Sequence, residues 1–170
     1  MIHVYFGDGK GKTTAALGLL VRACGCGMEC VMVQFLKDWK CGELETLCGM
    51  QNVTVLRGKA DGASFSINMT EEELAKTRAI HNENLKKAIE LCAKGGLLVL
   101  DELLDAVSLG LIDDSLVRGL LDAPPAGLEI AITGHGAVDW IMERADYITE
   151  MVKRRHPYDT GVQARRGIEF

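Results

Sequence analysis

A chain of 170 residues with a hydrophobic fraction of 48% is long enough to form one domain with a substantial core. Its formal charge of −5 gives no bulk electrostatic reason to bind nucleic acid, and no apolar run approaches the roughly 20 residues of a membrane span. The first residues lead directly into an expected strand, without the regions of a secretory signal peptide, so we expect a cytoplasmic protein.

Short strands alternate with helices along the whole chain. The expected strands are β-branched or continuous apolar runs at residues 2–6, 29–35, 53–56, 97–102, 128–133 and 147–152. The expected helices cover residues 12–24, 43–48, 70–94, 103–109, 114–122 and 137–144. Thr70 and Glu73 have the spacing of a capping box, and Asp113 or Asp114 is expected to cap its helix. This alternation predicts a single α/β domain over residues 1–170, with a mainly parallel six-stranded sheet flanked by helices and a basic, irregular tail from about residue 153.

A glycine-rich stretch joins the first strand to the first helix, with the sequence Gly7-Asp8-Gly9-Lys10-Gly11-Lys12-Thr13-Thr14. Glycines allow consecutive backbone N–H groups to face an anion, and the helix N-terminus adds partial positive charge. Lys12 and Lys10 supply full charges, and the Thr13 hydroxyl can ligate a magnesium ion held by phosphates. The stretch ends like the pattern G-x-x-x-x-G-K-[ST], although Phe6 stands at its first glycine. The flanking strand and helix favour a phosphate cradle of the P-loop NTPase type over a turn without a ligand.

Other candidate residues follow the expected strands at the same edge of the sheet. Asp101 and Glu102 end an apolar strand, and either one could hold magnesium or merely cap the next helix. Since adjacent strand residues point to opposite faces, we expect only one of the two to face the metal. His135, between two glycines, is either a nucleotide contact or a plain loop histidine. The basic residues of the tail either meet a phosphate or form a solvated face; they are Lys153, Arg154, Arg155, Arg165 and Arg166.

The six cysteines contain no C-x-x-C pair, and we interpret them as reduced thiols. The residue chemistry as a whole predicts an enzyme that binds a nucleoside triphosphate with magnesium, and it leaves the acceptor open.

Several segments in order along the chain carry a more specific signal. They are the glycine-rich stretch, residues 33–37, 42–43, 99–103, 132–136, 145–146 and 149–151, and the tail 156–170. Together they resemble the P-loop ATP:corrinoid adenosyltransferases, which act on cob(I)alamin or cob(I)yrinic acid a,c-diamide. The resemblance implies that the 5′-deoxyadenosyl group of ATP is transferred to the cobalt(I) of a reduced corrinoid and that inorganic triphosphate is released.

The resemblance also implies roles for individual residues. Lys12, Lys10 and the backbone of the glycine-rich stretch would neutralise the leaving triphosphate. Thr13 and Glu102 would ligate Mg²⁺ or Mn²⁺, with Asp101 close by. The implied assembly is a homodimer, and an electron-donating flavoprotein is an expected partner.

The chain departs from the family pattern in two places. The family usually carries an N-terminal extension that helps to cover the active site, whereas this chain begins almost at its first strand. The family also has an aromatic Gly-Phe-Thr-Trp segment after the third strand, and the nearest match here is Gly62-Ala63-Ser64-Phe65. We expect Phe65 to act in catalysis, because an apolar side chain against the lower face of cobalt excludes a ligand and eases reduction; core packing is the alternative.

Two other functions are open at this point. A small P-loop kinase would release ADP, and a non-catalytic ATP-binding module would consume no ATP.

Overall fold

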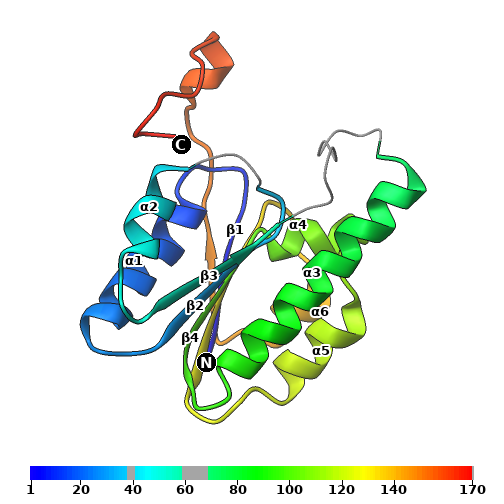
Figure 1. Ribbon diagram of the computed structural model, residues 1–170. Coiled ribbons are helices and arrows are strands. Elements are labelled where there is room, and N and C mark those ends of the chain that lie inside the picture. The colour runs from blue at the N-terminus through cyan, green and yellow to red at the C-terminus, as the bar shows by residue number, and fades with distance from the viewer. Residues whose placement is uncertain (38–40, 59–68, 170) are drawn as a thin grey trace.

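The computed structural model describes residues 1–37, 41–58 and 69–169, which form a central sheet with helices on both sides (Figure 1). Six strands make up the sheet in the order β3-β2-β4-β5-β1-β6, and every neighbouring pair is parallel. The strands are β1 (Ile2–Phe6), β2 (Cys30–Gln34), β3 (Val53–Arg57), β4 (Gly96–Asp101), β5 (Leu128–Thr133) and β6 (Tyr147–Glu150). The predicted α/β fold with a parallel six-stranded sheet is therefore confirmed.

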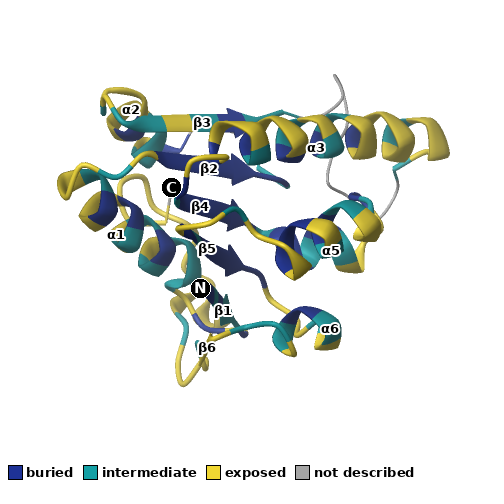
Figure 2. Cartoon of the chain, turned by 90° about the horizontal axis from the view of Figure 1, so that it is seen from below, coloured by how far each residue is buried: buried dark blue, intermediate teal, exposed yellow. Residues whose placement is uncertain are grey.

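Helices α1 and α2 cover one face of the sheet, and α3 to α6 cover the other (Figures 1 and 2). Their bounds are α1 (Lys12–Gly25), α2 (Gly42–Cys48), α3 (Glu71–Leu91), α4 (Leu103–Ser108), α5 (Asp114–Asp122) and α6 (Asp139–Met142), and a short 3₁₀ helix, η1 (Pro157–Thr160), lies in the tail. Each corresponding expected helix is present, with ends moved by a few residues. Among the helices of these described ranges, none combines the length and apolarity needed to cross a membrane.

The apolar strands are continuous because both of their faces are covered. In β2, Cys30 and Met32 pack into the core under α1, while Val31 and Val33 pack into the core on the α3 side. The same alternation continues along β4, whose residues 97 and 99 face α1 and whose residues 98 and 100 face the opposite core. A parallel strand buried on both faces is expected to read as such a run. In this interior, burial raises the pKa of the Cys30 and Cys92 thiols to about 11, which leaves them unreactive.

The two predicted helix caps have different outcomes. Thr70 accepts a hydrogen bond from the Glu73 N–H, and the Glu73 carboxylate accepts one from the Thr70 N–H, so the capping box is confirmed. Asp113 occupies the N-cap position of α5 but makes no side-chain cap. Its carboxylate instead pairs with Arg78 and accepts a hydrogen bond from Asn82, both on α3, so it joins two helices.

Candidate active site at the carboxyl edge of the sheet

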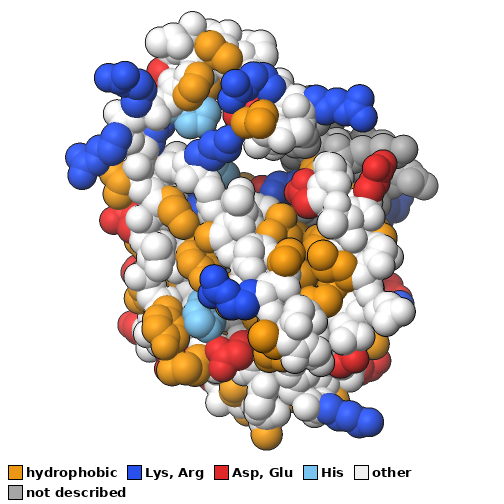
Figure 3. Space-filling view, turned by 90° about the vertical axis from the view of Figure 1, so that its left-hand side faces the viewer, with side chains coloured by type: hydrophobic (Ala, Val, Ile, Leu, Met, Phe, Trp, Pro, Cys, Tyr) orange, Lys and Arg blue, Asp and Glu red, His pale blue; other side chains and the backbone are white. Residues whose placement is uncertain are grey.

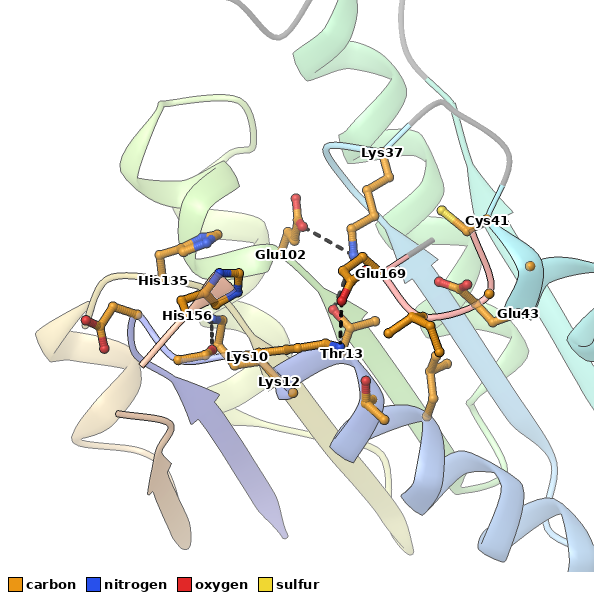
Figure 4. A pocket seen from close by; sticks show the side chains of 18 of the residues that line it. Lys10, Lys12, Thr13, Lys37, Cys41, Glu43, Glu102, His135, His156 and Glu169 are labelled. Carbon is orange, nitrogen blue, oxygen red and sulfur yellow. Dashed lines mark hydrogen bonds and ion pairs between the residues drawn. The ribbon is translucent and has the colours of Figure 1, made fainter. Parts of the chain in front are cut away.

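A cavity of about 620 Å³ opens at the carboxyl edge of the sheet, where the loops after β1, β2, β4 and β5 meet (Figure 4). The glycine-rich stretch forms its floor, the first turn of α2 one wall, and the C-terminal tail its roof. The residues that line it outside the stretch include Lys37, Cys41, Glu43, Thr46, Glu102, His135, His156 and Glu169. Ligands of open α/β sheets bind at this edge, so the fold places the predicted residues where a ligand site is expected.

The backbone N–H groups of the glycine-rich stretch differ in their partners: the first ones bind other parts of the protein, and the later ones face the cavity side without such partners among the described residues. The Gly7 N–H donates to the His135 carbonyl over 3.0 Å, and the Gly9 N–H donates to the Met151 carbonyl over 2.6 Å. These two amides are therefore engaged within the protein. In the described part of the chain, none of the close backbone hydrogen bonds outside the helices and strands has its donor among the N–H groups of residues 10–14, which include the first turn of α1. These remaining donors are the ones available to an anion in the cavity.

The two lysines of the stretch lie at different depths. The Lys12 ammonium donates to the carbonyls of Gly7 and Gly9 over 2.7 and 2.9 Å, so the side chain curls over the loop and fixes its shape. Burial lowers the pKa of Lys12, and nearby carboxylates, Asp105 first, oppose that shift. Lys10 lies at the mouth of the cavity, half-exposed, with its ammonium 3.2 Å from a Glu169 oxygen. The structure thus places Lys12 inside the predicted cradle and Lys10 at its rim.

Asp8 lines the cavity and also binds the backbone of the tail. Its carboxylate accepts a hydrogen bond from the Lys153 N–H over 2.9 Å, and this bond is the main reason why the pKa of Asp8 is lowered. Asp8 therefore ties the start of the tail to the glycine-rich stretch.

Asp101 is the fully buried hub of the polar network beneath the cavity. One carboxylate oxygen accepts hydrogen bonds from the hydroxyls of Thr13 and Thr133, each over 2.8 Å. The other accepts from the Gln34 amide over 3.3 Å and the Lys37 ammonium over 2.9 Å. Four donors therefore satisfy this buried carboxylate, and its bond to the Thr13 hydroxyl fixes the orientation of Thr13.

Glu102 lies beyond the end of β4, so the alternation expected of two adjacent strand residues does not apply to it and Asp101. It follows β4 with a φ of 63°, the one positive φ of a non-glycine residue among the described residues. Its N–H donates to the Thr133 hydroxyl over 2.9 Å, which holds this costly conformation in place. The turn breaks the strand alternation, so the Lys37 ammonium lies 2.9 Å from Asp101 and 3.3 Å from Glu102. Burial raises the pKa of Glu102, while Lys37 opposes that shift.

The donor set at this point fits a magnesium ion that is shared with a bound polyphosphate. It offers the Thr13 hydroxyl and two carboxylates, and in residues 1–37, 41–58 and 69–169 no group of three or more His, Cys, Asp or Glu side chains could hold a metal alone. Mg²⁺ is usually bound through one or two carboxylates with substrate phosphates and water completing its shell. Of the two carboxylates only Glu102 lines the cavity, which makes it the better direct ligand and leaves Asp101 to orient Thr13.

The tail folds back over the cavity. Figure 3 shows a hollow between the tail and the body of the domain, with Lys and Arg side chains around it. Glu169 contacts Lys10 at the rim and also accepts hydrogen bonds from the backbone and side chain of Arg165, which hold its pKa at about 2. Lys153 pairs with Asp159 over 3.2 Å. Two members of the basic cluster are thus engaged by acids of the tail itself.

His135 lines the cavity but is mostly exposed. Its N–H donates to an Asp105 oxygen over 3.0 Å, and its ring nitrogen Nδ1 lies 3.3 Å from the same carboxylate. The histidine is oriented by α4, and both interpretations of it stay open. Phe65 lies outside the described residues.

The sequence reasoning gave no role to Lys37 and none to Glu169. A signal for Lys37 was present, since a lysine soon after a buried parallel strand falls at the same edge as the other site residues. Glu169 carried no such signal, because its approach to Lys10 depends on the path of the tail.

Comparisons with known proteins agree with the segments described above. A family model described as "ATP:corrinoid adenosyltransferase BtuR/CobO/CobP" matches residues 1–170. The chain is 33% identical to the corrinoid adenosyltransferase of Pseudomonas aeruginosa over 173 residues, which cover 100% of this chain and 83% of that relative. It is 32% identical to the corrinoid adenosyltransferase CobA of Salmonella typhimurium, with 100% and 85% of the two chains covered. A corrinoid adenosyltransferase of Escherichia coli K12 is similar at 31% identity.

Proposed function

The chain belongs to the ATP:corrinoid adenosyltransferase family, and from this premise we propose that it transfers the 5′-deoxyadenosyl group of ATP to the cobalt(I) of a reduced corrinoid. The bond between cobalt and C5′ forms with an electron pair from cobalt. The bond between C5′ and its oxygen breaks, and inorganic triphosphate leaves with the electron pair of that broken bond. The membership does not favour a small kinase or a non-catalytic module.

The observation that carries this proposal is the cavity lined by hydrogen-bond donors and lysines. The reaction needs no nucleophile from the protein. Cobalt(I) attacks the ribose carbon itself, so the protein has to position ATP and neutralise the leaving group. The open N–H groups of residues 10–14 and the Lys12 ammonium suit the leaving triphosphate, and Lys10 adds charge at the rim.

We further propose that Thr13 and Glu102 ligate Mg²⁺ or Mn²⁺ and that Asp101 orients Thr13. When bound, such an ion would supply charge neutralisation to the triphosphate. Phe65 is proposed to lie against the lower face of the corrinoid, and this assignment rests on the family resemblance alone. A homodimer and an electron-donating flavoprotein are proposed on the same ground, and a cytoplasmic location is proposed from the sequence of the first residues.

The test is anaerobic incubation of the protein with ATP, Mg²⁺ and chemically reduced cob(I)alamin. We expect the light-sensitive spectrum of an alkylcobalt product, with one inorganic triphosphate released per product formed. Release of ADP would support the kinase instead, and unchanged ATP in the presence of cob(I)alamin would support the binding module.

Glu169 is expected to compete with ATP for Lys10. Because the Glu169 carboxylate lies 3.2 Å from the Lys10 ammonium at the rim, Glu169→Gln frees that charge for the phosphates. An exposed ion pair is worth about 0.2–1 kcal/mol, so the variant should bind ATP up to about fivefold more tightly. Calorimetric titration with Mg-ATP in the absence of corrinoid measures the change. Glu83→Gln, an exposed acid on α3, is the control and should bind like wild type, whereas unchanged or weaker binding by Glu169→Gln would contradict the competition.

A further inference from the structure

Lys37 places its ammonium group at the point where the proposed metal ligands converge (Figure 4). Its Nζ lies 2.9 Å from an Asp101 oxygen, 3.2 Å from the Thr13 hydroxyl and 3.3 Å from a Glu102 oxygen. The side chain is only 14% exposed, and its ammonium forms ion pairs with both carboxylates. A charged ammonium therefore balances the carboxylate pair in this structure.

A divalent cation bound to the same oxygens would repel the Lys37 ammonium from its present position. Mg²⁺ binds its oxygen ligands at about 2.1 Å, so it would lie close to an ammonium that contacts those same atoms. Like charges at such separation, in a largely buried site, repel strongly. Either the ammonium moves away or the metal binds weakly.

The surroundings of Lys37 allow its side chain to move while its backbone stays. The Arg57 guanidinium donates to the Lys37 carbonyl over 2.8 Å, which fixes the chain at this position next to β3. The flexible side chain itself lines the cavity, as do the open N–H groups of the phosphate cradle. An ammonium that leaves the carboxylates would therefore face the proposed triphosphate position.

We propose that Lys37 is the internal counter-ion of Asp101 and Glu102 in the metal-free protein, that it gives up this place to the divalent cation, and that its ammonium then turns to the polyphosphate. This inference rests on the metal site of the proposed function. It makes metal and nucleotide binding cooperative, because the displaced ammonium gains an anionic partner only when the nucleotide is present.

The experiment measures Mn²⁺ binding to the nucleotide-free protein through the electron paramagnetic resonance signal of free Mn²⁺. Lys37→Met removes the competing charge and shortens the side chain by only one atom, so it should bind Mn²⁺ at least tenfold more tightly than wild type. Lys87→Met removes the same charge from an exposed position on α3, away from the two carboxylates, and its affinity should stay within twofold of wild type. Equal or weaker binding by Lys37→Met would overturn the inference.

If Lys37→Met folds poorly, its Tm measured with and without Mn²⁺ still tests the inference. Without metal, the unpaired carboxylates should lower the Tm of Lys37→Met below that of wild type, and Mn²⁺ should raise it at concentrations at least tenfold lower than wild type requires. If Mn²⁺ does not restore the fold and Lys37→Gln binds Mn²⁺ no more tightly than wild type, the inference is wrong.

These readouts involve neither ATP nor corrinoid. If the protein fails to alkylate cobalt, Mn²⁺ can still displace Lys37, and the inference stands. If the protein alkylates cobalt but Mn²⁺ does not displace Lys37, only the inference about Lys37 is wrong.

Discussion

Lys12→Ala is expected to lower kcat/KM for ATP in cobalt alkylation by about 1000-fold, the loss that follows removal of one strong donor from a leaving group that gains charge. The Lys12 ammonium is the full charge deepest in the phosphate cradle, where it contacts the carbonyls of Gly7 and Gly9. Its removal withdraws one charge from the triphosphate and also releases the loop that presents the remaining N–H donors. The measurement is the rate of alkylcobalt formation from chemically reduced cob(I)alamin.

The fold should survive this substitution, because Lys12 belongs to neither apolar core. Circular dichroism and the Tm of Lys12→Ala should match wild type within a few degrees. Lys94→Ala, an exposed lysine beyond the end of α3, removes the same charge far from the cavity and should keep the wild-type rate. A Lys12→Ala enzyme with more than one tenth of the wild-type kcat/KM would refute the phosphate-cradle assignment.

The fold was accessible from the sequence because its signals are local. Strands buried on both faces appear as continuous apolar runs, and helices α1 to α3 are bounded by glycines or by the Thr70 capping box. Parallel pairing then follows from the alternation of strands and helices, and it brings the loops after β1, β4 and β5 to one edge. The glycine-rich stretch and the two carboxylates could be placed together on that basis alone.

The finer arrangement of the site depends on contacts between distant segments. The conformation of Glu102 is stabilised by Thr133, more than 30 residues away, and strand alternation without that contact predicts the wrong direction for its side chain. Lys37, which follows β2, reaches the carboxylates at the end of the neighbouring strand β4, and Glu169 reaches Lys10 because the tail turns back over the cavity. Sequence patterns describe neighbours along the chain, so they leave these partnerships open.

The glycine-rich stretch supports a second large effect, this time on stability. Gly7→Ala should lower the free energy of unfolding by about 2–5 kcal/mol, because two costs add at this position. Gly7 has a φ of 111°, which strains any residue with a side chain, and a Cβ atom there would lie 2.5 Å from the Met151 carbonyl oxygen. The expected loss is a large part of the 5–15 kcal/mol that typically stabilises a domain. Urea denaturation followed by circular dichroism measures it.

Two neighbouring glycines separate these costs. Gly11 has a nearly equal φ of 114°, but a Cβ there would meet nothing within 4 Å, so Gly11→Ala should cost only the backbone strain of about 1–2 kcal/mol. Gly9 lacks a left-handed φ, but its Cβ would lie 2.6 Å from the same Met151 oxygen, so Gly9→Ala should cost the steric part of about 1–3 kcal/mol. If Gly11→Ala destabilises the protein as much as Gly7→Ala, the packing of the stretch against Met151 contributes nothing. If Gly7→Ala destabilises the protein most, as expected, the close contact with Met151 helps to hold the phosphate cradle against the end of β6, where the tail begins its path over the cavity.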